Sequence, residues 1–512
     1  MKIALTIIIL FTCFITFSQL KTGKVLELDD KKGFANTTIY PAGKRGFFLL
    51  TKEIEGKKAE LSYYSTDLKK QITIPLERKF PTVDLGVVTD EDSVVFSFVE
   101  SSFYYWVIKE FNTETLTLEQ KKYEKTHRYF VPAGSLFFEH KIVINGALHK
   151  RAKVMVLDPR TGKDEFLELP GSHPKGAFAT VTIDHTYHRL SVLYRTTSFS
   201  KVASLNLVFL DADWKLSEPY VLKGDREYPI LDGKVIWTGE NSFVLAGTVM
   251  TNPRGGYKVS GFYFSKWENH TRLFVDYYFF NEFRDYTRYL QGSRQTVTRS
   301  ISKESPVMEY LENYVVFHPI YVNGSGYRLI GEVYNPKFDY GTTTIDSRSW
   351  LDWAFWLVAD VPLSPNRRIT EYTTTFKGFQ FSHAAVLDLD ESGNKINDYC
   401  FALKPASLSQ TLKPLLCVGS GPDGSLKMGY VQQKKGISVQ ETVADSVKTT
   451  FVNCLAKNIT DMVGRVQDMR CVSWYENNYL VYGYESLQSK EDFIKGFIGT
   501  PSIFFVKRVS YP

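Results

Sequence analysis

GKVIWTGENSFVLAGTVMTNPRGGYKVSGFYFSKWEN, residues 233–269, decides the fold of this chain. Lys234–Thr238 predicts a short strand, Gly239–Asn241 a turn, and Ser242–Thr251 a mostly apolar strand. A longer turn containing proline and glycine follows, and Tyr257–Trp267 then alternates as a third strand. Short β-branched and aromatic runs bounded by Gly, Asn and Pro are typical of antiparallel hairpins. The stretch therefore predicts one unit of an all-β sheet.

The rest of the chain repeats this unit. Eight hairpin-rich segments begin near residues 33, 82, 127, 178, 229, 313, 412 and 469. Most of these starts are about 45–57 residues apart, at or slightly above the period of propeller blades. The sequence thus predicts a β-propeller-like ring of about seven or eight antiparallel blades, with two smaller β-domains as the alternative. We expect the apolar strand Ser502–Val509 to pair with the N-terminal segment, because closure removes exposed sheet edges.

One interruption of the repeat is the insertion Asn335–Gly378. It contains Trp350, Trp353 and Trp356, which share one side of a helix at this spacing. We expect one helical insertion whose tryptophans dock a partner, because Trp is enriched at interface hot spots. Packing of the same tryptophans back onto the ring is the alternative.

A second interruption is Phe274–Lys303, whose first half is dense in Phe and Tyr. These aromatics follow no single period, so we expect most of them in the core. The cations Arg284 and Arg288 are predicted as a secondary partner contact, with a solvated surface as the alternative.

The N-terminus has the pattern of a secretory signal peptide. Lys2 precedes the apolar run Ile3–Ile15, and Thr16 and Ser18 place small residues before a cleavage site after residue 18. No later run reaches the roughly 18–20 apolar residues needed to span a bilayer. We expect a single mature domain over residues 19–512, located in a periplasm or secreted.

Composition excludes some classes of function. The chain has 512 residues, 43% of them hydrophobic, and a net charge of +6 from 62 basic and 56 acidic side chains. The hydrophobic content argues against disorder, and the weak, mixed charge argues against nucleic-acid binding. Whether the four mature cysteines form disulfides or remain core thiols stays open, and they are Cys400, Cys417, Cys454 and Cys471.

The search for catalytic and ligand motifs favours turns. Gly419–Gly424 matches GxGxxG but lies between two expected strands, where a dinucleotide site would need a following helix. Asp388–Gly393 begins like a calcium loop but lacks the carboxylate at position twelve, and Asp184–His188 lacks a third metal ligand. We expect no cofactor, no metal and no enzymatic activity. A site built from loops of several blades remains the alternative.

The residues Phe17–Gln19, the repeated hairpins and the strand and turn at Phe379–Asn394 resemble exported β-propeller-like proteins of Bacteroidota-type bacteria. That resemblance implies a protein partner in the cell envelope. The expected function is a non-enzymatic periplasmic protein-interaction subunit of an outer-membrane transport or secretion complex, such as an accessory or plug of a type 9 translocon. Two alternatives stay open, namely a glycan-binding module of a nutrient-uptake system and a propeller-type hydrolase or lyase.

Overall fold

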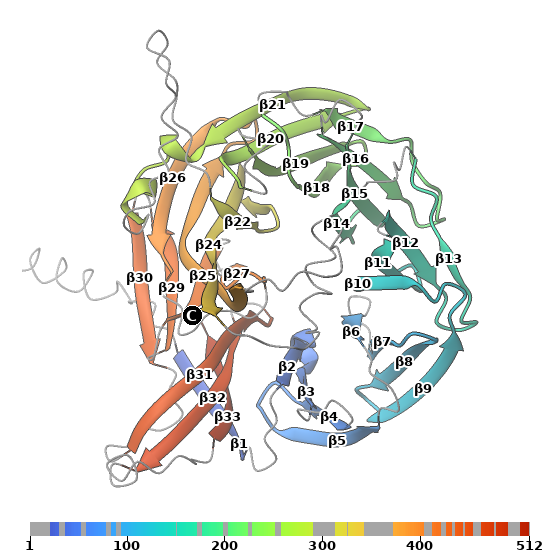
Figure 1. Ribbon diagram of the computed structural model, residues 1–512, viewed down its shortest axis with the longest axis vertical. Helices are drawn as coiled ribbons and strands as arrows, with labels where there is room; N and C mark the ends of the chain where they lie inside the picture. The colour runs from blue at the N-terminus through green and yellow to red at the C-terminus, as the bar shows by residue number, and fades with distance from the viewer. Residues whose placement is uncertain are drawn as a thin grey trace, which may run out of the picture.

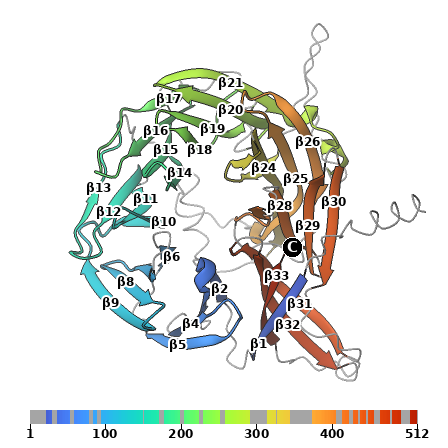
Figure 2. The same cartoon turned by 180° about the vertical axis from the view of Figure 1, so that it is seen from behind.

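The protein is an all-β ring of antiparallel sheets (Figures 1 and 2). The structure is a computed structural model that describes residues 21–29, 36–52, 58–77, 83–88, 94–149, 151–170, 177–197, 203–223, 228–250, 258–289, 313–324, 326–342, 372–403, 412–420, 426–432, 436–443, 446–453, 462–475, 478–489 and 502–510. These residues form eight sheets, which confirms the predicted propeller. Helical structure within the same ranges consists of three short 3-10 turns.

The first four sheets each contain four strands in chain order. The first has β2 (Asn36–Pro41), β3 (Phe47–Lys52), β4 (Lys58–Tyr64) and β5 (Lys70–Glu77), with the turn η1 (Gly43–Arg45). The second has β6 (Val83–Val88), β7 (Val95–Ser101), β8 (Tyr105–Asn112) and β9 (Thr117–Glu124). The third has β10 (Phe130–Phe138), β11 (Lys141–Leu148), β12 (Arg151–Leu157) and β13 (Asp164–Phe166). The fourth has β14 (Ala177–Asp184), β15 (Arg189–Thr197), β16 (Ala203–Leu210) and β17 (Tyr220–Lys223).

The later sheets include two departures from that pattern. The fifth has β18 (Lys234–Gly239), β19 (Ser242–Val249), β20 (Gly261–Glu268) and β21 (Thr271–Phe279), followed by η2 (Phe280–Glu282) and η3 (Tyr286–Tyr289). The sixth has five strands, β22 (Tyr314–Phe317), β23 (Tyr321–Asn323), β24 (Gly326–Thr342), β25 (Tyr372–Leu389) and β26 (Lys395–Ala402). The seventh has β27 (Cys417–Ser420), β28 (Leu426–Gln432), β29 (Gly436–Val443) and β30 (Ser446–Asn453). The eighth joins β1 (Lys21–Asp29) to β31 (Met462–Ser473), β32 (Asn478–Ser489) and β33 (Ser502–Ser510).

The two ends of the described chain close the ring, as predicted. β1 pairs antiparallel with β33, with Leu26 opposite Val506. The eighth sheet also contacts the first, because the indole N–H of Trp474 donates a 2.7 Å hydrogen bond to the carbonyl of Gly46. Both atoms are buried, so the closure joins two sheets by a satisfied polar contact as well as by apolar packing.

The core lies between neighbouring sheets. The strands β18, β19 and β20, which lie within residues 233–269, pack their apolar side chains against the fourth sheet. Phe243 is fully buried there, stacked 5.7 Å from Trp267. The high aromatic content is therefore used mainly between sheets, where large flat side chains bury much area.

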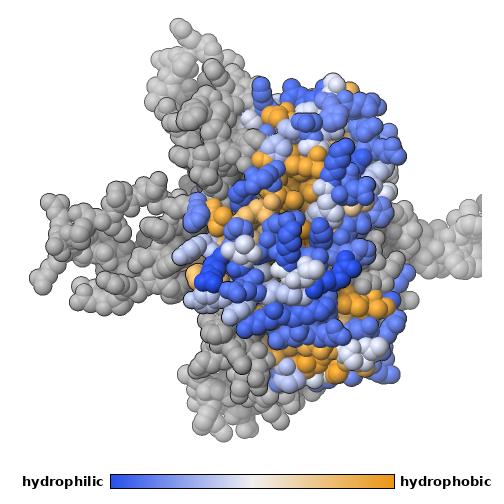
Figure 3. Space-filling view, turned by 90° about the vertical axis from the view of Figure 1, so that its right-hand side faces the viewer, coloured by the Kyte–Doolittle hydropathy of each residue, from blue (hydrophilic) through white to orange (hydrophobic). Residues whose placement is uncertain are grey.

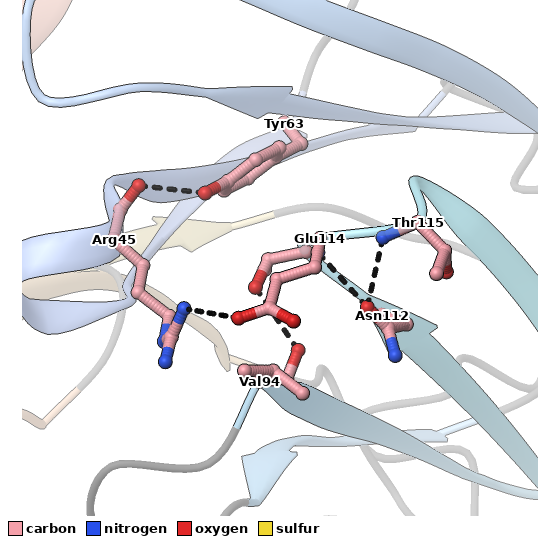
Figure 4. A network of polar contacts seen from close by, with 7 residues as sticks. Arg45, Tyr63, Val94, Asn112, Glu114 and Thr115 are labelled. Carbon is pink, nitrogen blue, oxygen red and sulfur yellow. Dashed lines mark hydrogen bonds and ion pairs between the residues drawn. The ribbon is translucent and has the colours of Figure 1, made fainter.

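Polar contacts also join neighbouring sheets. Figure 4 shows one between the first and second sheets, in which Arg45 of η1 lies 3.5 Å from the carboxylate of Glu114. The hydroxyl of Tyr63 donates to the carbonyl of Arg45 at 2.6 Å. Asn112 accepts hydrogen bonds from the backbone N–H groups of Glu114 and Thr115, which fixes the turn that presents Glu114.

The predicted insertion Asn335–Gly378 begins and ends as strand. β24 and β25 remain paired out to Thr342 and Tyr372, so the sixth sheet carries a hairpin longer than its neighbours. Residues 335–342 and 372–378 thus continue the ladder of the sixth sheet. The helix expected over Trp350, Trp353 and Trp356 lies outside the described residues.

The predicted interruption at Phe274 is also corrected. Residues 271–279 form β21, the fourth strand of the fifth sheet, so the repeat breaks only after Phe279. η2 and η3 then pack Phe280, Phe283 and Tyr286 against the sixth sheet, and all three are buried. The core interpretation of these aromatics is confirmed.

The cysteines are described only in part, and the N-terminal signal segment is not described. Cys400 and Cys417 are buried free thiols, whereas Cys454 lies outside the description. The signal peptide predicted over residues 1–18 lies outside it as well. In the ranges that are described, no helix has the length and hydropathy to cross a membrane.

Candidate functional site

Two hairpin turns and one connection place their residues on the same side of the ring. The turns are β7–β8 and β11–β12, and the connection is β9–β10. Because successive strands of these sheets are antiparallel, the turn between the second and third strands lies at the same end as the connection to the next sheet. The second and third sheets therefore bring three segments together at one end.

Aromatic side chains at these segments are exposed. We define the aromatic patch as Phe103, Tyr104, Tyr105, Tyr129 and His149. Phe103 is 51% exposed, Tyr104 47% and Tyr129 68%, and Val131 beside Tyr129 is 63% exposed. Large apolar side chains of soluble proteins are individually exposed quite often, but a contiguous group of them marks an interaction site.

Ring contacts show that the patch is contiguous. Phe103 lies 4.8 Å from Tyr104 and 5.9 Å from Tyr129, measured between ring centroids, and meets both rings nearly at right angles. Tyr129 in turn lies 6.0 Å from His149. The row Phe103, Tyr129, His149 thus links the turns of two sheets across their junction.

Cations lie over the patch. The ammonium of Lys122 is 3.7 Å from the centroid of the Tyr105 ring, and the guanidinium of Arg128 is 5.3 Å from that of Tyr104. Arg128 also donates to the exposed carboxylate of Glu124 at 2.9 Å. Exposed cation–π and ion pairs of this kind each contribute about 1 kcal/mol or less, so these side chains are positioned but not locked.

The backbone beneath the patch is held by hydrogen bonds. The N–H of Ser102 donates to the carbonyl of Tyr105, and the N–H of Tyr105 donates to the Ser102 hydroxyl, both at 3.0 Å. The N–H of Lys125 donates to the carbonyl of Tyr104 at 2.9 Å, which ties the β9–β10 connection to the β7–β8 turn. The patch is therefore presented by a defined backbone.

The junction below the patch is a buried polar network. The indole N–H of Trp106 donates to Asp164 of the third sheet at 3.0 Å, and the N–H of Thr126 donates to the same carboxylate. The ammonium of Lys125 donates to the Ser101 hydroxyl at 2.6 Å and lies 4.0 Å from the centroid of the Trp106 ring. Burial lowers the pKa of Lys125 to about 8, and the negative charge of Asp164 opposes that shift.

The outer side of the ring has a different surface from the end that carries the aromatic patch. Figure 3 looks onto the side formed by the outer strands β9, β13 and β17, and its surface is mostly polar with separate apolar areas. The aromatic patch is defined by its ring contacts at the turns.

The residues predicted as partner contacts lie elsewhere. Arg284 is exposed between η2 and η3, and its backbone N–H donates to Asp398 of β26 at 3.1 Å. Arg288 lies in η3 and its side chain is outside the described residues, as are Trp350, Trp353 and Trp356. The partner role of these five residues stays a prediction.

Asp184–His188 forms the β14–β15 turn, where Asp184 accepts a hydrogen bond from the N–H of Tyr187 at 2.9 Å. This turn lines a cavity of about 290 Å³ with Glu139, which lies 3.1 Å from His188. Within the ranges that the structure describes, no three His, Cys, Asp or Glu side chains are arranged to hold a metal ion.

The other two motifs are also turns or flank them. Asp388 forms a buried bidentate pair with Arg328, at 2.6 and 2.9 Å, while Asp390 accepts hydrogen bonds from the following backbone. The start of Gly419–Gly424 lies in β27, which pairs directly with β28, so this segment joins two strands as predicted.

The sequence reasoning missed the patch. The turn between β7 and β8 is formed by Phe103 and Tyr104 themselves. A signal was present, since a tight turn has no local need for two large aromatic residues. Two adjacent large aromatic residues in the β7–β8 turn are therefore the sequence feature that indicates the patch.

No protein-family model and no curated protein matches the sequence. Among solved structures, the Dos1 propeller aligns with 9% identity over 80% of each chain and a TM-score of 0.41. The WD40 domain of SCAP from fission yeast aligns with 8% identity over 96% of each chain and a TM-score of 0.39. Dihydro-heme d1 dehydrogenase NirN in complex with DHE aligns with 9% identity over 94% of this chain and 78% of that one, with a TM-score of 0.41. Likenesses this weak carry no argument about function.

Proposed function

We propose that this chain is a non-enzymatic protein-interaction subunit that binds its partner through the aromatic patch. The observation that carries the proposal is the contiguous exposure of Phe103, Tyr104 and Tyr129 beside Arg128. Tyr and Arg are enriched among residues that dominate binding energy, and they act best where a rigid surface presents them.

The hydrogen-bonded base supports this proposal. Partner binding costs less when the binding residues are already ordered, and the turns that carry the patch are held by the contacts of Ser102 and Lys125. The base is also formed at a junction between two sheets, so the patch depends on the packing of the second sheet against the third and not on one hairpin.

The place of action that we propose is the cell envelope. The signal-like N-terminus supports export, and the resemblance to Bacteroidota-type proteins supports an outer-membrane transport or secretion complex. In such a complex the ring would act as a scaffold, and the patch would be the side that meets the next subunit.

The test is purification of the protein with its partners from the native envelope. The double variant Phe103→Ser/Tyr129→Ser should lose the partner, because truncating two hot-spot residues weakens binding by at least about 2 kcal/mol, roughly 30-fold. The matched control is Leu273→Ser/Ile396→Ser, which removes apolar side chains of similar exposure, 51% and 66%, from the fifth and sixth sheets. Equal recovery of the partner by both double variants would refute the proposal.

A further inference from the structure

The patch has a shape and a charge that restrict what it can bind. Phe103 meets Tyr104 at 86° and Tyr129 at 84°, whereas the planes of Tyr129 and His149 are tilted by 34°. A flat run of coplanar rings would suit the faces of successive sugar units. Rings set at right angles instead form notches, which fit protruding side chains of a polypeptide.

The length of the patch fits a short extended segment. The row from Phe103 through Tyr129 to His149 consists of two ring contacts of 5.9 and 6.0 Å. An extended chain advances about 3.3 Å per residue, so the row spans at most roughly four residues. Alternate side chains of such a segment would point toward the rings.

The charge around the patch is positive. Lys122 is exposed, and among the described residues it has no carboxylate partner. Arg128 forms an ion pair with Glu124, and the two side chains are 49% and 67% exposed. The neighbouring cation Lys121 is neutralised by Glu110 at 2.5 Å, which leaves Lys122 as the surplus charge at the patch.

We propose that the aromatic patch binds an acidic, extended peptide segment of its partner, in which aromatic, proline or aliphatic residues alternate with Asp or Glu. The apolar residues would enter the notches beside Phe103, and the carboxylates would pair with Lys122 and Arg128. Opposite charge at a rim mainly sets specificity and association rate, so a basic or neutral segment would be discriminated against. This inference rests on the proposed function, because it names the chemistry of the same partner.

A random displayed library of twelve-residue peptides tests the inference on the full-length protein. Peptides are selected on the immobilised protein and counter-selected on Phe103→Ser/Tyr129→Ser. The expected result is enrichment of Asp or Glu together with Phe, Trp, Pro or Leu. A selected peptide should bind at least tenfold more weakly to Lys122→Glu/Arg128→Glu, and raising the salt from 50 to 500 mM should weaken it several-fold. The Leu273→Ser/Ile396→Ser protein should bind it normally.

Other outcomes separate the two proposals. Enrichment of basic or uncharged peptides that still require Phe103 and Tyr129 overturns the acidic partner and leaves the protein-interaction function intact. A neutral oligosaccharide, cellohexaose, is titrated in parallel by calorimetry. If it binds in a patch-dependent way while no peptide is enriched, the patch is a glycan site and both proposals fail. If neither binds, the inference is overturned, and loss of the native partner from the Phe103→Ser/Tyr129→Ser protein still decides the function.

Discussion

Two junctions between neighbouring sheets use buried polar contacts in different ways. Between the sixth and seventh sheets, Glu332 accepts hydrogen bonds from the N–H groups of Leu415 and Leu416, both at 2.9 Å, and contacts His318 at 2.5 Å. Glu332 and His318 are both buried. Between the second and third sheets, Trp106 and Asp164 form a similar contact, but the aromatic side chains continue outward and end in the exposed patch.

The difference separates stability from binding. A buried carboxylate that has all its hydrogen-bond partners holds two sheets together. Removing one partner lowers the stability of the fold strongly, because a buried polar group is then left without a hydrogen bond. Exposed rings contribute little to the packing of the sheets, because they would be buried only when a partner binds. Substitutions of the buried polar groups should therefore lower the free energy of unfolding, whereas substitutions in the exposed patch should weaken partner binding and leave unfolding nearly unchanged.

The largest effect is expected for Glu332→Ala. It leaves two backbone N–H groups and His318 buried without their acceptor, so we expect the free energy of unfolding to fall by about 3–5 kcal/mol. Urea unfolding measures the change. Glu391→Ala, which removes an exposed glutamate from the β25–β26 turn, is the matched control and should change stability by less than about 0.5 kcal/mol. A loss below about 1 kcal/mol for Glu332→Ala would mean that this carboxylate does not hold the junction.

A second test uses pH at the junction of the fifth and sixth sheets. Burial lowers the pKa of His383 to about 4, and its ring packs against Tyr286 at 4.7 Å between centroids. The unfolded chain, with a pKa near 6.5, takes up the proton first, so acidification from pH 6.5 to 4 should destabilise the fold by up to about 3 kcal/mol through this residue. Below pH 4 both states are protonated and the effect is complete.

Unfolding in urea at pH 7, 5.5 and 4 checks this expectation by comparison with His383→Gln. Carboxylates titrate in both proteins, and only the difference in pH dependence reports His383. Parallel curves for the two proteins would show that the imidazole is not held in its neutral form by the fold.

A smaller effect is expected for Trp106→Phe. The substitution removes the indole N–H that donates to Asp164 while Thr126 continues to donate, so stability should fall by about 2 kcal/mol. Tyr105→Phe is the control at the next position, with an expected change below about 0.5 kcal/mol. If thermal unfolding shows no difference between the two variants, the hydrogen bond from Trp106 to Asp164 does not stabilise this junction.

The smallest effect on stability is expected for Phe103→Ser/Tyr129→Ser. Both side chains are about half exposed or more, so unfolding should change by less than about 0.5 kcal/mol per site although binding is lost. Circular dichroism during heating measures the first property, and the peptide assay the second. A stability loss above about 2 kcal/mol would show that the patch holds the junction together, which would remove the contrast.

The architecture could be predicted from the sequence because it depends on local patterns that recur. Each of the eight expected segment starts lies within seven residues of the first residue of a strand. In order, these strands are β2, β6, β10, β14, β18, β22, β27 and β31. Strand periodicity and turn residues specify such units independently of one another. The turn Asp158–Lys163 is one example, where Gly162 takes a φ of 74° that favours glycine.

The candidate site could not be predicted in the same way, because it depends on contacts between units. Phe103 and His149 are far apart in sequence, and only the packing of the second sheet on the third brings their turns together through Tyr129. The sequence also does not show whether an aromatic side chain is buried or exposed. Phe243 and Phe103 both stand at or near a turn between strands, yet one is in the core and the other at the surface.

The pairing of β1 with β33 has a consequence for the order of assembly. The first seven sheets are each built from neighbouring segments, whereas the eighth needs residues 21–29 and 462–510 together. Bringing partners as distant as Leu26 and Val506 together costs roughly 5 kcal/mol of chain entropy if nothing between them is folded, and far less once the earlier sheets have curved around. The seam should therefore close last and open first, so protease sensitivity during refolding should disappear latest at these two segments.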